Sequence, residues 1–146
     1  GQEEEAVTRL ARVGYDNTVG YLKGGVKAYE DAGRILSTIT SFTADSIAEK
    51  HGEINIVDVR KPGEYDSEHV IDAISYPLDY INNNLNELEK SKTYYVHCAG
   101  GYRSVIAISL LMKNGYTNLI DIAGGFGAIH ETNIPKTAYV CPSTLK

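Results

Sequence analysis

One strand–loop–helix segment constrains the fold of this chain more than any other feature. Residues 93–97 are mostly aromatic and β-branched, which is typical of a short buried strand. A glycine-containing loop, residues 98–104, follows directly, and residues 105–113 are apolar nearly all round. An apolar run of this kind predicts a buried helix, which Asn114 and Gly115 end.

Strand-like and helix-like segments alternate along the rest of the chain. Residues 54–59 are apolar and β-branched and are followed by a Pro–Gly breaker, as expected of a buried strand. Shorter candidates complete the pattern, with strands at residues 73–77 and 119–122 and helices at residues 44–50 (capped by Thr43), 85–90 and 126–130. The alternation predicts an α/β fold with an open, mostly parallel sheet and helices on both faces.

Composition places the chain among globular proteins and argues against several classes of partner. Of its 146 residues, 42% are hydrophobic and 23% are charged. The formal net charge of −5 argues against nucleic acid and anionic membranes as partners. The N-terminus lacks the basic and apolar regions of a secretory leader, and no apolar run is long enough to cross a membrane. We therefore expect a cytoplasmic protein with no nucleic-acid and no membrane partner.

The two cysteines, Cys98 and Cys141, do not form the dense pattern of a secreted disulfide scaffold. Cys141 lies in a tail that contains proline and serine, where it is either an incidental thiol or a resolving thiol opposite Cys98. The four histidines are scattered, and no cluster of histidine, cysteine and acidic residues has metal-ligand spacing. We expect neither a metal nor a cofactor.

Two short motifs occur twice, in the same order and at nearly the same spacing. Residues 14–17 (Gly-Tyr-Asp-Asn) match residues 115–118 (Gly-Tyr-Thr-Asn). Residues 24–28 match residues 124–128, and both copies start with Gly-Gly. Two ordered matches indicate an internal repeat.

The repeat predicts how the chain is organised into domains. We expect residues 1–36 to be the trailing helix–strand–helix of a truncated second copy of the domain. Residues 37–146 are then the complete domain with a C-terminal tail. A half-domain exposes apolar surface that a second copy of the chain can cover, so a homodimer is one assembly that the sequence allows.

The loop of the strand–loop–helix segment combines the groups that activate a thiol. Cys98 lies at the carboxyl end of the strand, where open parallel sheets bind their ligands. Gly100 and Gly101 let the backbone curl, so that successive N–H groups point inward and bind an anion. Arg103 can hold an anionic group, and Ser104 can cap the helix or reach the sulfur. These groups favour a thiolate or persulfide over an inert buried thiol.

Cys98 is therefore the predicted catalytic nucleophile. The predicted substrate-binding residues are the rest of the loop: Ala99, Gly100, Gly101, Tyr102, Arg103 and Ser104. Tyr102 is expected to contribute its backbone N–H, while its ring shapes the entrance to the site.

An ordered set of motifs around the loop resembles the rhodanese family. The set consists of Val57-Asp58-Val59-Arg60 with Glu64, of His69-Val70-Ile71-Asp72-Ala73 before Tyr76-Pro77, of the loop at residues 98–104, and of Gly124-Gly125-Phe126. It covers residues 40–136, roughly two thirds of the chain. Glu68 and Asp72 stand where the family commonly has glycine, and both belong to the scaffold.

The resemblance implies a rhodanese-like fold and a sulfurtransferase. In that reaction Cys98 takes a sulfane sulfur from thiosulfate, a polysulfide or a low-molecular-weight persulfide, and the loop stabilises the Cys98 persulfide. A thiol, cyanide or sulfite then accepts the sulfur. Arg103 is the residue expected to orient an anionic donor.

Asp58 and Arg60 are expected to support the site and not to react. Asp58 is interpreted as a scaffold residue that anchors loops near the site. Arg60 is interpreted as half of an ion pair, with Glu64 as the candidate partner. His69 and His97 are interpreted as hydrogen-bonded packing residues.

Two other functions stay open. Related folds use a Cys…Arg loop in phosphatases and arsenate reductases, but four residues separate Cys98 from Arg103 here, one fewer than in the phosphatase signature. A tetrahedral phosphate needs the wider ring, whereas a single sulfur atom fits the tighter one. The second alternative is a non-catalytic persulfide-binding regulatory module, although degenerate copies of this kind usually lose the cysteine.

The repeat followed by a complete domain is similar to the C-terminal part of certain bacterial fusion proteins. In these, a metallo-β-lactamase-fold domain precedes one or two rhodanese domains. The resemblance implies such an upstream domain as a partner within the full-length chain, and a place in persulfide metabolism. None of that domain's histidine motif is present in these residues.

Overall fold

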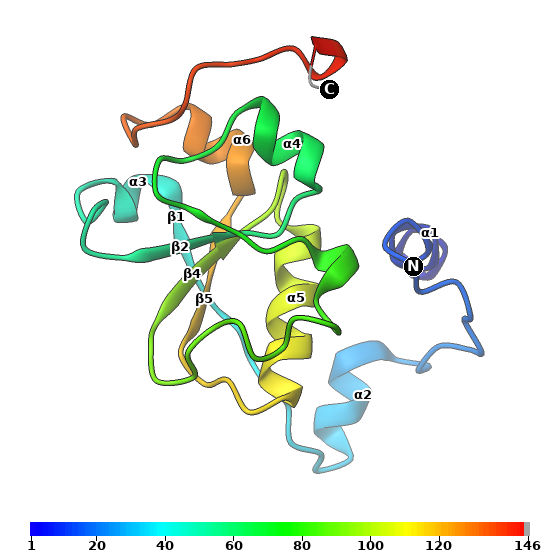
Figure 1. Ribbon diagram of the computed structural model, residues 1–146. Helices are drawn as coiled ribbons and strands as arrows, with labels where there is room; N and C mark the ends of the chain where they lie inside the picture. The colour runs from blue at the N-terminus through cyan, green and yellow to red at the C-terminus, as the bar shows by residue number, and fades with distance from the viewer. Residues whose placement is uncertain (145–146) are drawn as a thin grey trace. The chain divides into compact units, whose positions relative to one another are not determined.

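The computed structural model describes residues 1–144 and divides into two compact units between Thr38 and Ile39. In Figure 1 the first unit runs from the N-terminus through the blue helices, and the second contains the sheet and the helices around it. The division lies close to the boundary expected at residue 36. The second unit carries Cys98 and is described first.

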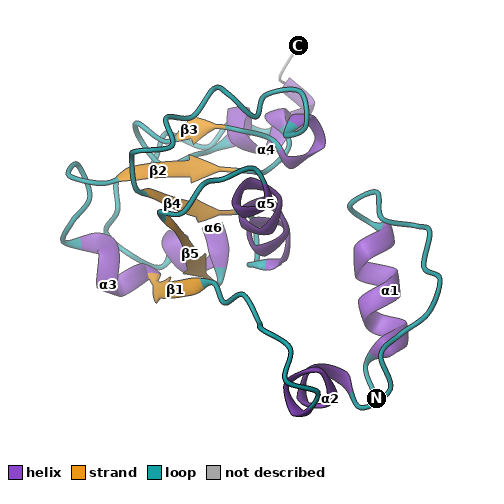
Figure 2. Cartoon of the chain, turned by 90° about the horizontal axis from the view of Figure 1, so that it is seen from below, coloured by secondary structure: helices purple, strands orange, loops and turns teal. Residues whose placement is uncertain are grey.

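The second unit is built on a five-stranded sheet in which all neighbouring strands are parallel. The strand order is β1-β5-β4-β2-β3, with bounds Thr40–Thr43 (β1), Asn55–Asp58 (β2), Ile74–Ser75 (β3), Tyr94–His97 (β4) and Leu119–Ala123 (β5). Figure 2 shows these strands (orange) side by side. The expected open parallel sheet is confirmed, and β4 lies in its middle.

Helices cover the sheet. Within the described residues of this unit they are α3 (Ala44–Ala48), α4 (Pro62–Ser67), α5 (Tyr102–Lys113) and α6 (Gly125–His130), with short 3-10 turns at Leu78–Tyr80 and Pro142–Thr144. A buried cluster joins Ile56 and Ile122 of the sheet to α3 and to Ile129 of α6. Helix α5 packs on β4 and β5, and Figure 1 shows it across the strands from α3. Helices therefore lie on both faces, as expected.

Three local expectations differ from the structure. Strand β1 was not predicted, because its four residues are all exposed at the sheet edge and carry no apolar alternation. Helix α4 starts at Pro62, which sequence reasoning took for a breaker, although proline is tolerated at the first helical position. The helix expected at residues 85–90 does not form. Instead, the carbonyls of Leu85 and Leu88 accept hydrogen bonds from the buried Tyr116 hydroxyl.

The two scaffold positions that replace a common glycine adopt different backbones. Asp72 has φ +65°, a left-handed conformation that aspartate tolerates better than most residues. Glu68 is extended (φ −165°) and ends α4, and its carbonyl accepts a hydrogen bond from Arg60. Both substitutions therefore fit the scaffold.

The first unit contains helices α1 (Glu3–Ala11) and α2 (Gly25–Asp31). The strand expected between them does not form: residues 15–22 have no regular secondary structure. The physical reason is that a strand needs a neighbouring strand for its backbone hydrogen bonds, and residues 1–38 supply none. The helix–strand–helix prediction is wrong in this respect.

The repeated glycines nevertheless have matching backbones in the two units. The φ angles are +92° and +87° for Gly14 and Gly115, +84° and +78° for Gly24 and Gly124, and +60° and +58° for Gly25 and Gly125. The helix ends match as well, since the N–H of Tyr15 donates to the carbonyl of Leu10 and that of Tyr116 donates to the carbonyl of Leu111. The repeat in sequence is therefore also a repeat in local geometry.

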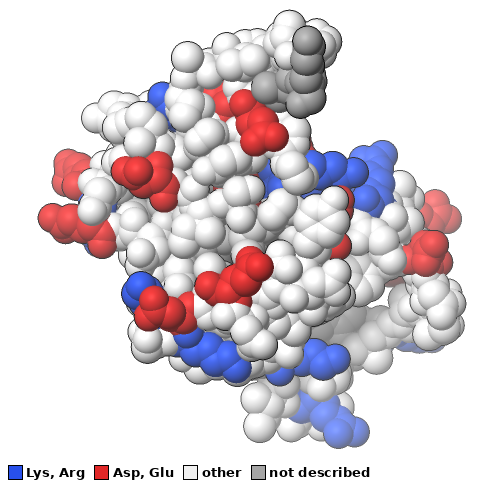
Figure 3. Space-filling model, viewed as in Figure 1, with Lys and Arg blue, Asp and Glu red and all other residues white. Residues whose placement is uncertain are grey.

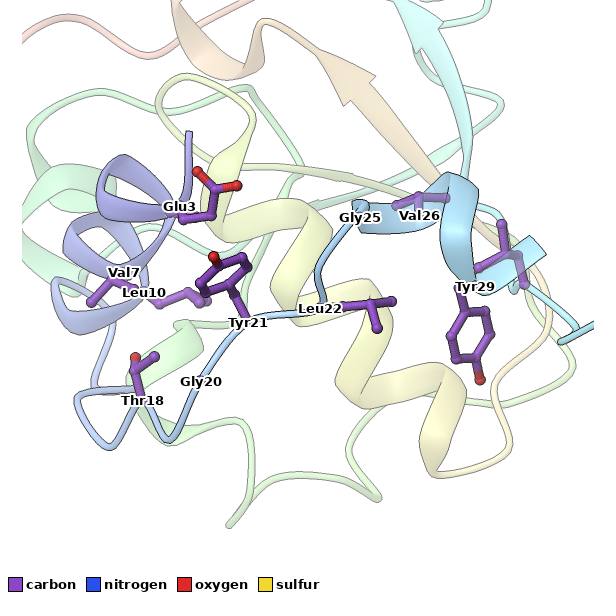
Figure 4. A pocket seen from close by; sticks show the side chains of 12 residues that line it. Glu3, Val7, Leu10, Thr18, Gly20, Tyr21, Leu22, Gly25, Val26 and Tyr29 are labelled. Atoms are coloured by element: carbon purple, nitrogen blue, oxygen red, sulfur yellow. The ribbon is translucent and has the colours of Figure 1, made fainter. Parts of the chain in front are cut away.

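An apolar hollow of about 500 Å³ lies within the first unit. Val7 and Leu10 of α1, Tyr21 and Leu22 of the connecting segment, and Tyr29 of α2 are among the residues that line it (Figure 4). All five side chains are at least a third exposed. This unit thus presents apolar surface to solvent.

Charge is distributed without an extended patch of one sign on the face in view. Figure 3 shows lysine and arginine (blue) interspersed there with aspartate and glutamate (red). Over residues 1–144, no helix combines the length and the hydropathy that crossing a membrane requires.

Candidate active site

Cys98 directly follows β4 and is 1% exposed. Its position is the carboxyl end of the central strand, where parallel sheets of this kind bind ligands. Helix α5 begins four residues later, at Tyr102, after Gly101 turns the chain with φ +100°. A side chain at position 101 would be strained in this left-handed conformation, so glycine is required for the turn.

The loop curls around the sulfur. The backbone N–H of Gly101 donates a hydrogen bond to Cys98 Sγ across 3.1 Å. Ala99 and Gly100 are exposed on the outside of the curl, and Tyr102 is 50% exposed at the start of α5. A backbone N–H aimed at sulfur stabilises a thiolate or the inner part of a persulfide. Of the loop N–H groups expected to point inward, that of Gly101 contacts the sulfur, and anion binding by the loop stays a prediction.

Ser104 and Asp121 lie behind the sulfur. The Ser104 hydroxyl is 3.7 Å from Cys98 Sγ and donates to Asp121 Oδ1 across 2.7 Å. Asp121, on β5, also accepts a hydrogen bond from the Ser41 hydroxyl on Oδ2 at 2.9 Å. Sequence reasoning found Ser104 but missed Asp121. The signal that was available is an acidic residue in the middle of an otherwise apolar strand.

Arg103 forms a bidentate ion pair with Glu64 of α4, with nitrogen–oxygen distances of 2.6 and 2.9 Å. The hydrogen bond from Arg103 lowers the pKa of Glu64, and the same bond raises the pKa of Arg103. The guanidinium expected to hold an anionic donor is thus occupied by a carboxylate of the same chain. A donor that uses Arg103 has to share it with Glu64.

Arg60 does not pair with Glu64, which corrects the sequence-based expectation. Its partner is Asp58, which is fully buried at the end of β2 and receives three side-chain hydrogen bonds from Arg60. The guanidinium also donates to the carbonyl of Glu68 and lies 3.9 Å from the ring centroid of Phe126. Asp58 lies only two residues from Arg60 along the chain. Glu64, on α4, pairs with Arg103 instead. Asp58 and Arg60 together tie β2 to the segment after α4 and to α6.

The start of α6 braces the loop. Phe126 N–H donates to the carbonyl of Cys98 at 2.6 Å, and Gly127 N–H donates to that of Ala99 at 3.1 Å. A Cβ atom at Gly125 would clash with Cys98 O and would lie 2.8 Å from the carbonyl carbon of Ala99. The loop and α6 therefore approach so closely that position 125 has no room for a side chain.

His69 is a hydrogen-bonded packing residue, as interpreted from sequence, whereas His97 is only partly hydrogen-bonded, because its Nε2 is buried without a hydrogen-bond partner among residues 1–144. His97 is fully buried and its Nδ1 lies 3.2 Å from the carbonyl of Cys98. Burial lowers its pKa, which favours the neutral ring. His69 bonds through Nδ1 to the carbonyl of Tyr65 and stacks on the Tyr65 ring. In the described part of the chain, the hydrogen bonds of Cys98 Sγ are to Ser104 and Gly101 and not to either ring.

Cys141 lies in the C-terminal segment, where it is exposed and free. The neighbouring residue Val140 is held by two hydrogen bonds to Ser67, one from backbone and one from the side chain. Cys141 Sγ contacts the Ser143 hydroxyl at 3.0 Å. A resolving role for Cys141 stays a prediction.

Comparison with known proteins agrees with this fold. The family model described as "Rhodanese-like domain" matches residues 43–132. The chain is 30% identical over 101 residues to the uncharacterized protein YqhL of Bacillus subtilis (69% of this chain, 78% of that protein). It is 29% identical over 86 residues to a protein named sulfurtransferase from Allochromatium vinosum (59% and 80%). Among solved structures, a rhodanese-related protein of Thermoplasma volcanium matches with a TM-score of 0.62 and 30% identity, covering 67% of this chain and 97% of that chain.

Proposed function

The chain belongs to the rhodanese-like domain family, and on that premise we propose that it is a sulfurtransferase that carries sulfur on Cys98. The observation that carries the proposal is the position of Cys98 Sγ, which lies at the carboxyl end of the central strand with the Gly101 N–H directed at it. Relatives named sulfurtransferase support the same class of reaction. The proposed donors are thiosulfate, polysulfide and low-molecular-weight persulfides, and the proposed acceptors are thiols, cyanide and sulfite.

The reaction has two covalent steps. In the first, the Cys98 thiolate attacks the sulfane sulfur of the donor; for thiosulfate the S–S bond breaks and its electron pair leaves with sulfite. The product is the persulfide Cys98-S-S⁻, whose inner sulfur keeps the hydrogen bond from Gly101. In the second, cyanide attacks the outer sulfur, the persulfide S–S bond breaks, and thiocyanate leaves while the thiolate is restored.

A hollow bounded by residues that brace the loop suggests how an anionic donor approaches. A hollow of about 350 Å³ is lined by Arg60, Glu64 and Phe126, with Tyr139 from the C-terminal segment. Two of these residues take part in the ion pairs that brace the site, Arg60 with Asp58 and Glu64 with Arg103. We propose that an anionic donor enters here and draws Arg103 away from Glu64.

Cys98→Ser tests the function. A serine hydroxyl cannot form a persulfide, so conversion of thiosulfate and cyanide to thiocyanate falls to background, and intact mass shows no added sulfur after exposure to a persulfide donor. Cys141→Ser, which changes the other free thiol, is the matched control and keeps the activity.

Other outcomes of the same experiment contradict the proposal. An unmodified Cys98 in the natural protein after incubation with donor argues against sulfur transfer. Aryl phosphate hydrolysis that disappears in Cys98→Ser supports the phosphatase alternative. A Cys98 persulfide that no acceptor removes supports the regulatory module.

We also propose that residues 1–36 are the end of a second rhodanese-like copy. Matching glycine φ angles and helix-end hydrogen bonds support this, and the exposed apolar surface fits a unit that packs against further protein or against a second copy of the chain. The sequence resemblance supports the further proposal of an upstream metallo-β-lactamase-fold domain in the full-length chain. The two free thiols support the proposal of a cytoplasmic location.

A further inference from the structure

Asp121 is a buried acid next to the site whose role the reaction does not yet include. It lies on β5, directly opposite Ser41 of β1, and is 6% exposed. Its two oxygens each accept a hydroxyl hydrogen bond, from Ser41 on Oδ2 and from Ser104 on Oδ1. Among the described residues, no lysine, arginine or histidine forms an ion pair with it. A buried carboxylate held only by hydroxyls is costly, which points to a use.

Ser104 has one hydroxyl hydrogen, and two groups compete for it. The Asp121 carboxylate lies 2.7 Å from Ser104 Oγ, closer than the carbonyl of Gly101 at 3.2 Å, so the hydrogen is directed at Asp121. The lone pairs of Ser104 Oγ then accept the Cys98 S–H across 3.7 Å. This arrangement suits the thiol form of Cys98.

The thiolate form requires a different arrangement. Once the thiol proton has passed to solvent, the sulfur anion faces a lone pair of Ser104 unless the hydroxyl turns from Asp121 to sulfur. Asp121 then keeps only its bond from Ser41, and its own negative charge opposes the new anion. The N–H of Gly101 acts in the opposite direction, because it favours the anion.

The other titratable groups around the site are already paired, or burial disfavours their charged form. Arg103 of α5 is paired with Glu64 of α4, and Arg60 is paired with Asp58 of β2. Burial lowers the pKa of His97 of β4, which favours its neutral ring, and the charges of Asp58 and Asp121 act against this shift. The charge of Arg103 still interacts with Cys98 and, like the Gly101 N–H, favours the thiolate, while Asp121 acts through Ser104 in the opposite direction.

We propose that Asp121 is a positioning residue that acts through Ser104 to hold Cys98 in its thiol form at rest. It restrains the thiolate that the Gly101 N–H favours. This inference rests on the proposed function of Cys98 as the sulfur carrier. Its test measures thiol ionisation and needs no sulfur transfer, so the two can fail independently.

Asp121→Asn separates charge and hydrogen bonding from shape. The amide has the size of the carboxylate, its Oδ1 can accept from Ser41, and its Nδ2 can donate to Ser104. Ser104 is then free to direct its hydrogen at the sulfur, and the opposing charge is gone. The variant therefore increases the reactivity of Cys98 below neutral pH, which is the opposite of what loss of a merely structural residue produces.

The experiment measures the rate of Cys98 alkylation by iodoacetamide as a function of pH, in a Cys141→Ser background so that one thiol reacts. In Asp121→Asn, we expect the pH at half-maximal rate to fall by about one unit, as removal of a close like charge produces. Asp66→Asn, an exposed aspartate of α4, is the matched control and leaves the profile unchanged. In a Ser104→Ala background the effect of Asp121→Asn shrinks by at least about half, because the hydroxyl link is absent.

Two results overturn the proposal. One is an unchanged or higher midpoint in Asp121→Asn with the near-UV circular dichroism of the natural protein. The other is an equal shift with and without Ser104, which assigns the effect to charge alone. Should Asp121→Asn fail to fold, the ¹³C resonance of the Asp121 carboxylate in the natural protein gives the answer. It is expected to move at the pH where Cys98 ionises, and a resonance that stays constant there contradicts the proposal.

Discussion

The glycine pairs Gly24–Gly25 and Gly124–Gly125 have nearly the same left-handed backbone but different surroundings. A Cβ at Gly25 meets no atom within 4 Å, whereas one at Gly125 meets the backbone of the Cys98 loop. Both pairs open a short helix, α2 in one unit and α6 in the other. The turn and the helix start are therefore local properties of the sequence, while the brace on the active-site loop exists only where a sheet carries that loop.

The same contrast holds for the apolar residues. Leu10 and Leu111 occupy matching positions at the ends of α1 and α5, yet Leu10 is 37% exposed and Leu111 is fully buried. Tyr15 and Tyr116 follow them in the same turn, with exposures of 43% and 2%. The difference shows that the same local geometry adds little to the free energy of unfolding unless its apolar side chains are buried against a sheet. Paired substitutions can test this directly.

Gly125→Ala is expected to have the largest effect, with Gly25→Ala as its partner. Both substitutions put a side chain on a left-handed backbone, which costs about 1–2 kcal/mol. Only Gly125→Ala also forces the Cβ into the backbone of Cys98 and Ala99, so it displaces the loop and removes sulfur transfer. Thiocyanate formation and urea unfolding measure the two effects. Full sulfur-transfer activity in Gly125→Ala would contradict the prediction that the close contact at position 125 holds the loop in place.

The second-largest effect is expected from Leu111→Ala, with Leu10→Ala as its partner. Removal of the buried Leu111 side chain leaves a cavity against β4 and β5 and lowers the free energy of unfolding by about 2–5 kcal/mol. Leu10→Ala changes the unfolding of residues 39–144 by less than about 0.5 kcal/mol, as an exposed substitution does. Urea unfolding followed by near-UV circular dichroism checks both. A large loss in Leu10→Ala shows that the first unit is covered in solution.

Tyr116→Phe and Tyr15→Phe sharpen the comparison at the level of one hydroxyl. The Tyr116 hydroxyl donates to the carbonyls of Leu85 and Leu88, so its removal leaves buried acceptors unpaired and costs about 1–3 kcal/mol. The corresponding change at the exposed Tyr15 is expected to be within about 0.5 kcal/mol of zero. Thermal unfolding of the two variants side by side is the measurement, and equal shifts contradict the prediction.

Residues with local or periodic signals were predictable. The strands at residues 54–59, 93–97 and 119–122 and the helix after the loop follow from apolar runs and breakers, and the structure contains all four. Cys98, Gly101 and Ser104 follow from the loop, where each residue type has a specific chemical use. Asp121 was missed because an isolated acid in a strand has no pattern around it.

Pairings between distant segments were not predictable from local patterns. Sequence proximity suggested Glu64 for Arg60, but Glu64 reaches Arg103 across 39 positions of sequence, and Arg60 turns back to Asp58. Residues 85–90 have helical spacing, yet two carbonyls of that segment accept hydrogen bonds from the hydroxyl of Tyr116, which is distant in sequence. In each case a long-range contact outweighs a local preference of a few tenths of a kcal/mol.

By itself, the sequence determined the parallel α/β class, the thiol at the end of a strand, the length of its loop and the left-handed glycine turns of both repeats. These depend on backbone sterics and on periodicity, which act within a few residues. Only the tertiary structure decided which turn braces the loop, which acid each arginine pairs with, and that Asp121 stands behind Ser104. Those outcomes depend on which strands become neighbours, because only then do buried groups separated by many residues share one hydrogen-bond network.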